Sequence, residues 1–77
     1  ELKDLVEEIV KLSKENLKLW EDHSRVLEEI VRLLKHKDND EREVRRLLKL
    51  LEDLTRRAEE TSRRIEEIVK EAEDRAR

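Results

Sequence analysis

The chain has 77 residues, of which 19 are basic and 22 acidic, and its net charge is −3. It contains no Cys, Gly, Pro, Met, Phe or Tyr. This composition excludes disulfide bridges and thiolate metal sites. The balanced charges give no general attraction to phosphate or to anionic lipid, so we expect neither a nucleic-acid nor a membrane partner.

Residues 2–37 are predicted to form a first helix, because their apolar residues recur every seven positions. Two columns form the centre of its apolar face: Leu2, Ile9, Asn16, His23 and Ile30, and then Val6, Ser13, Trp20, Leu27 and Leu34. Leu5, Leu12, Leu19, Val26 and Leu33 flank them on one side, and Val10, Leu17, Ser24 and Val31 on the other. The seven-residue repeat predicts a straight or slightly left-handed supercoiled bundle.

Residues 38–40 are predicted to form a tight turn that separates two helices. Asn39 can adopt the left-handed conformation that ends a helix. Asp40 is a good N-cap, and Glu43 three residues later completes a pattern like a capping box. One continuous helix is the less favoured alternative, because Asp38, Asn39 and Asp40 combine poor helix propensity with good capping chemistry.

Residues 41–77 are predicted to form a second helix with a narrower apolar face. Its core columns include Leu47, Leu51, Leu54, Ala58, Ile65 and Ile68, and its middle carries the polar residues Thr55, Thr61 and Ser62. Folding the chain about residue 39 places Asn16 level with Thr61 and Ser62, Trp20 level with Ala58, and His23 level with Thr55 and Leu54.

Polar residues therefore occupy the middle third of an otherwise apolar core. Those predicted to form a buried polar network are Ser13, Asn16, Trp20, His23, Ser24, Thr55, Thr61 and Ser62. A buried Asn must pair its amide or lose stability, and its best-attested use is to select a partner and a register. The alternative is that Asn16 opens onto solvent.

The polar residues do not form a recognisable reactive site. Helical di-metal sites use Glu-x-x-His, but position 20, three residues before His23, is Trp. Ser24 follows His23 directly, and side chains at neighbouring positions of a helix do not face each other. We expect no enzymatic activity, cofactor, metal or small-molecule substrate; a symmetric metal site across an oligomer axis is the minor alternative for His23.

The apolar face of the first helix spans about 160°, more than one antiparallel helix can cover. We therefore expect an all-α antiparallel helical hairpin that assembles with another hairpin, most simply itself, into a four-helix bundle. The interface core is expected to contain Leu2, Val6, Ile9, Leu27, Ile30, Leu34, Leu47, Leu51, Leu54, Ile65 and Ile68. One subunit of a heterodimer and a homotrimer of hairpins are the alternatives.

The pattern resembles de novo designed helical-hairpin oligomers with buried hydrogen-bond networks. The resemblance rests on the missing Gly, Pro and Cys, the turn at residues 38–40, the strictly charged outer columns and the polar centre. It implies that the polar network selects the intended partner, that there is no enzymatic role, and that no native compartment is defined. Many such designs have a glycine in the loop, and this chain has none.

Overall fold

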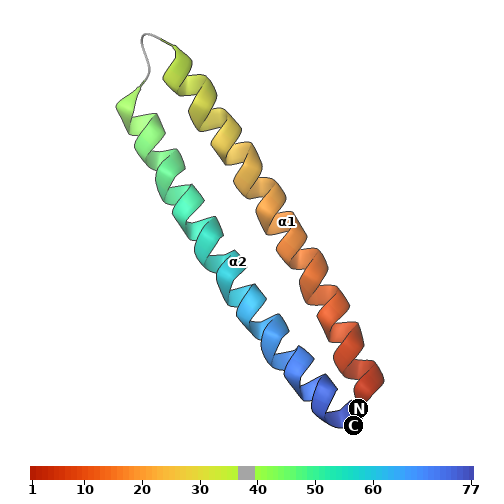
Figure 1. Ribbon diagram of the computed structural model, residues 1–77. Coiled ribbons are helices and arrows are strands. Elements are labelled where there is room, and N and C mark those ends of the chain that lie inside the picture. Colours follow the sequence, from red (N-terminus) through yellow and green to blue (C-terminus); the bar gives the residue numbers. More distant parts are fainter. Residues whose placement is uncertain (37–39) are drawn as a thin grey trace.

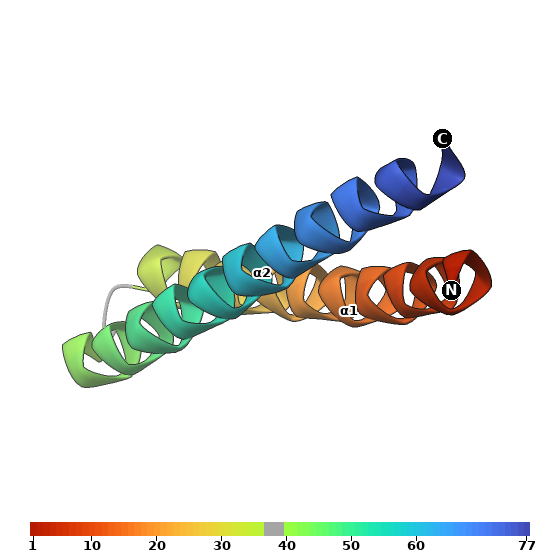
Figure 2. The same ribbon diagram turned by 90° about the horizontal axis from the view of Figure 1, so that it is seen from below.

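The computed structural model describes residues 1–36 and 40–77, which form an antiparallel hairpin of two long helices (Figure 1). Helix α1 spans Leu2–Lys35 and helix α2 spans Glu41–Ala76. The hairpin measures 60 by 14 by 13 Å, and both termini lie at the end away from the connection. The helices cross at a shallow angle rather than running strictly parallel (Figure 2). The predicted helical hairpin is confirmed.

The two helix ends near the connection differ in how they are closed. α1 ends two residues earlier than predicted, because His36 is extended (φ −84°, ψ 139°) and its N–H donates to the Leu33 carbonyl at 3.2 Å. α2 begins as predicted, and the Asp40 carboxylate caps it by accepting a hydrogen bond from the Arg42 N–H at 2.9 Å. The expectations for Asp38 and Asn39 lie outside the described residues.

The predicted capping box is wrong in its second half. The Glu43 carboxylate does not turn back to Asp40; it accepts hydrogen bonds from the guanidinium of Arg46, one turn further along α2. This partner holds the pKa of the Glu43 carboxyl below its ordinary value. An arginine three residues ahead offers a charged, bidentate donor, which competes well with a single backbone N–H.

The helices pack through only part of the apolar surface that the sequence provides. Among the described residues five are buried: Ile30, Leu47, Leu54, Ala58 and Ile68. On α1 the half-buried residues are Leu5, Ile9, Leu12, Asn16, Leu19, Asp22, His23, Val26, Glu29 and Leu33. The apolar ones, together with Asn16 and His23, belong to two of the four predicted columns. The residues of the other two columns of α1 are all exposed in the hairpin.

Ion pairs add little to this packing. In the part of the chain that the structure describes, one ion pair joins the helices, between Arg64 and Glu8 at 3.9 Å, and both side chains are about half exposed. The others connect residues three or four positions apart on one helix, such as Arg57 and Asp53. Exposed pairs of this kind contribute only ~0–1 kcal/mol each, so apolar contact holds the hairpin together.

We predict that Asp40→Ala lowers the free energy of unfolding by about 0.5–2 kcal/mol, because it removes the acceptor that caps α2. Urea denaturation at a fixed protein concentration measures the change. Asp40→Asn is the matched control, since its side-chain oxygen can still cap. Equal losses in both variants would mean that the cap bond is not the cause.

We predict that Ala58→Leu costs ~1–3 kcal/mol, because Ala58 is 0% exposed and extra methylenes would force the helices apart. Ala76→Leu, on the exposed last turn of α2, is the control and should change stability little. The melting temperatures of both variants are compared with that of the parent by thermal unfolding. An Ala58→Leu variant as stable as the parent would contradict close packing at this level.

Candidate functional site

One side of the hairpin exposes apolar side chains along its length. Those on α1 are Val6, Val10, Leu17, Trp20, Leu27, Val31 and Leu34, and α2 adds Leu48. Their spacings of three, four and seven residues place the α1 members on one stripe, which belongs to the two columns that α2 leaves uncovered. We call these eight residues the open face. Leu17 is 61% exposed and Val31 50% exposed, so the stripe is not covered by its own chain.

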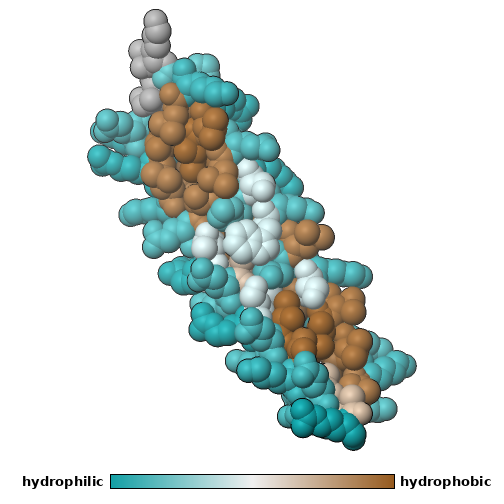
Figure 3. Space-filling model, viewed as in Figure 1, coloured by the Kyte–Doolittle hydropathy of each residue, from teal (hydrophilic) through white to brown (hydrophobic). Residues whose placement is uncertain are grey.

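The open face is divided into two apolar areas. Figure 3 shows brown surface towards the connection and towards the termini, with a paler area between them. This division follows the sequence, because Ser13 and Ser24 interrupt the stripe on either side of the Leu17–Trp20 level and are exposed. An apolar area of this extent on a small monomer is typical of an interaction surface.

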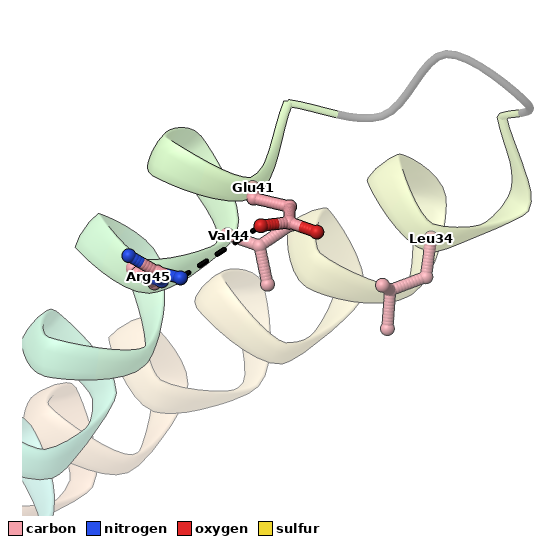
Figure 4. A pocket seen from close by; sticks show the side chains of 4 residues that line it. All are labelled: Leu34, Glu41, Val44 and Arg45. Atoms are coloured by element: carbon pink, nitrogen blue, oxygen red, sulfur yellow. Dashed lines mark ion pairs between the residues drawn. The ribbon is translucent and has the colours of Figure 1, made fainter.

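Near the connection the open face is slightly hollowed. Leu34 of α1 and Val44 of α2 line a hollow of about 380 Å³, together with the ion-paired Glu41 and Arg45, whose charged atoms are 3.7 Å apart (Figure 4). Both apolar side chains point to the same side of the hairpin. An apolar floor with a charged rim suits a side chain from a partner protein.

Within residues 1–36 and 40–77, two side-chain hydrogen bonds join the helices. His23 and Thr55 make one of them, at 3.1 Å between His23 Nε2 and Thr55 Oγ1. The Thr55 hydroxyl gives its only hydrogen to the Leu51 carbonyl at 3.0 Å. Thr55 must therefore accept, and His23 Nε2 must carry the proton that it donates. Both charge states of imidazole can supply this proton, so the bond itself does not require a neutral His23.

Asn16 and Ser62 make the other interhelical bond, in which Asn16 Nδ2 donates to Ser62 Oγ at 3.0 Å. Asn16 Oδ1 is buried, and within the described residues it has no partner. An unpaired buried carbonyl costs ~1–3 kcal/mol. We call Asn16, His23, Thr55 and Ser62 the polar layer. Among the described residues of the isolated hairpin, one hydrogen-bond acceptor of this layer, Asn16 Oδ1, is left without a donor.

Trp20 lies between these two bonds along α1, on the open face. Its ring meets His23 edge to face, with ring centroids 5.0 Å apart and an interplanar angle of 65°. The indole is still 42% exposed. It covers His23 from the open side, and its own outer surface remains exposed.

The structure sorts the predicted polar residues into two groups. It brings Asn16, His23, Thr55 and Ser62 together across the hairpin, in the predicted register. It leaves Ser13, Trp20 and Ser24 exposed on α1, and the Thr61 hydroxyl donates to the Arg57 carbonyl of its own helix at 2.9 Å. A single connected network is therefore not present within the hairpin.

The predicted interface core is also divided. Ile30, Leu47, Leu54 and Ile68 are buried within the hairpin, and Ile9, Leu51 and Ile65 are half-buried. Leu2, Val6, Leu27 and Leu34 are exposed. Within a single hairpin, the predicted interface core is therefore buried only in part, and four of its residues on α1 remain exposed.

Leu50 lies outside the apolar columns predicted from the sequence. It is 40% exposed and lines a hollow with Asp22, Arg25, Val26 and Leu54, on the opposite side of the hairpin from the open face. Leu50 falls in a column that is otherwise charged, so the heptad pattern gave no signal for it. Two of its four neighbours in this hollow are charged, and Leu50 does not extend the open face.

In residues 1–36 and 40–77 no group of three or more His, Cys, Asp or Glu side chains is arranged to hold a metal ion. Neither α1 nor α2, within the same residues, contains an apolar stretch long enough to span a membrane. Comparison with protein-family models, curated proteins and solved structures finds no match to this chain.

We predict that Thr55→Val costs about 1 kcal/mol, because it removes the acceptor of His23 while keeping the shape of the side chain. Thr61→Val is the matched control, since its hydroxyl bonds only its own helix, and it should cost less than ~0.5 kcal/mol. Urea denaturation measures both. If Thr55→Val lowered the free energy of unfolding less than Thr61→Val, the His23–Thr55 bond would not stabilise the hairpin.

Proposed function

We propose that this chain is a designed interaction protein whose function is specific self-association, in which two hairpins close into a four-helix bundle. The observation that carries the proposal is the open face, an apolar stripe along most of α1 that the chain's own second helix does not cover. Covering the exposed part of each such side chain contributes on the order of 1 kcal/mol.

The middle of the open face supplies the specificity of this association. Hydrophobic burial is non-directional, so the two apolar areas alone would tolerate sliding of one hairpin along the other. The exposed hydroxyls of Ser13 and Ser24 and the incompletely satisfied Asn16 fix a level at which polar groups must meet polar groups. Any other register would bury these groups against leucine and valine, at a cost of ~1–3 kcal/mol each.

A heterodimer and a homotrimer are the two alternative assemblies, and each is favoured by one feature of the hairpin. The unpaired Asn16 Oδ1 favours a different chain that supplies a donor, in which case this hairpin is one subunit of a heterodimer. The wide apolar face of α1 favours an inner ring of three α1 helices in a homotrimer. Both use the same open face.

The mass of the purified chain in solution tests the proposal. A mass of twice 9.4 kDa supports the homodimer. A mass of three chains supports the ring of three hairpins instead, and a monomer at micromolar concentration points to a different partner chain. Sedimentation equilibrium gives this mass without assuming a shape, which matters for a molecule as elongated as this one.

We predict that Leu17→Glu converts the assembly to monomers at micromolar concentration, because it places a charge at the most exposed point of the open face. Lys18→Glu is the matched control: it also introduces a glutamate, one position along α1 on an exposed, charged column. The control should keep the parent mass by light scattering. Retention of the parent mass by Leu17→Glu would contradict the open face as the interface.

A further inference from the structure

Between Val6 and Val31 the uncovered stripe of α1 has the same chemical order in both directions, whereas beyond this span Leu34 would fall opposite Lys3. Its members between residues 6 and 31, separated alternately by four and three residues, are Val6, Val10, Ser13, Leu17, Trp20, Ser24, Leu27 and Val31. All of them are exposed in the hairpin. Read from either end, the stripe gives two apolar residues, a serine and one further apolar residue before its centre.

Such a stripe is complementary to a reversed copy of itself. With the centre between Leu17 and Trp20, reversal pairs Val6 with Val31, Val10 with Leu27, Ser13 with Ser24, and Leu17 with Trp20. Every pair joins like with like, and each serine meets a serine hydroxyl as its hydrogen-bond partner. The large Trp20 indole meets Leu17 of the other copy rather than a second indole, so the two largest side chains are not packed against each other.

The two long edges of the open face are unequal, and this restricts how two hairpins can meet. The edge on α1 is apolar, since it contains Val10, Leu17 and Val31. The corresponding edge of α2 is charged and exposed, and consists of Arg45, Glu52, Glu59, Glu66 and Glu73. An apolar edge placed against that charged edge would take carboxylates out of water without a partner.

Two face-to-face hairpins can be related by a two-fold axis in two ways. An axis along the bundle puts both connections at one end and sets α1 beside the second copy's α2, which opposes the apolar edge to the charged one. An axis across the bundle puts the connections at opposite ends and sets α1 beside the second copy's α1, so that apolar meets apolar. The unequal edges favour the second arrangement.

The net charge of α2 changes sign along its length, although the edge that would meet its own copy is mainly acidic, with Glu52, Glu59 and Glu66. Residues 41–58 contain six basic and four acidic side chains, whereas residues 59–77 contain five basic and seven acidic ones. Reversed α2 helices side by side would place the positive half of each against the negative half of the other. Complementary charge of this kind selects orientation more than it adds affinity.

Given the proposed self-association, on which this pairing depends, we propose that two copies associate with their connections at opposite ends. The α1 helices run antiparallel to each other, and the two-fold axis crosses the seam at the Leu17–Trp20 level. The partner surface recognised by each open face is therefore the reversed open face of a second copy of this chain.

Distances between spin labels on single-cysteine variants test this orientation, because the chain has no cysteine of its own. Arg32→Cys places a label on an exposed position near the connection, and Asp4→Cys places one near the termini. In the proposed arrangement two labels at position 32 are ~40 Å apart along the bundle, at 1.5 Å per residue. Connections at one end would bring them to the same level, within about 30 Å, which is the width of a bundle plus the label arms.

A mixture of the two variants is the control, and should show a distance under ~30 Å that neither variant shows alone. A dimer mass with a short distance for Arg32→Cys alone would overturn the orientation and leave self-association standing. A monomer with no dipolar coupling, or a mass of three chains, would overturn the proposed homodimer and this pairing with it.

Discussion

The apolar face of α1 is wider than one helix can cover, and the rest of the structure follows from this mismatch. α2 has a narrower apolar face with charged columns on both sides, so it covers two of the four columns on α1. The buried core within the hairpin is accordingly thin and consists of Ile30, Leu47, Leu54, Ala58 and Ile68. A core of this size is marginal for an independent 77-residue fold without disulfides or metal. The uncovered half of α1 is therefore both the weakness of the isolated chain and the surface through which we propose that it associates.

The polar layer fixes the register along an otherwise uniformly apolar surface. The bonds from Asn16 to Ser62 and from His23 to Thr55 are two helical turns apart on α1 and set the register within the hairpin. Ser13, Trp20 and Ser24 lie at the same level along α1, on the side of the open face. Each interhelical bond contributes only ~1 kcal/mol to stability, but a shift in register would leave several polar groups unpaired at once. The layer thus acts chiefly on specificity, while the apolar areas at either end supply most of the affinity in the proposed assembly.

Much of the hairpin could be predicted from the sequence, because helix formation and register depend on local rules. The seven-residue repeat located both helices, Asp40 marked the start of α2, and the position of the turn correctly paired Asn16 with Ser62. The sequence could not show which columns of α1 face α2, since all four are similarly apolar and only the narrower partner decides between them. It also missed the Glu43–Arg46 pair, which competes with a capping bond of similar energy, and Leu50, which lies outside the repeat.

Self-association through the open face can be tested directly with Trp20, the only tryptophan in the chain and a member of that face. In an isolated hairpin its indole is 42% exposed, and a covering partner would remove it from solvent. Quenching of its fluorescence by iodide should be measured over a dilution series of the purified chain. Self-association through the open face predicts a shielded indole at high concentration that becomes accessible on dilution, with a midpoint that matches the loss of the dimer mass. An indole that is equally accessible at every concentration, in a chain that stays monomeric, would contradict it.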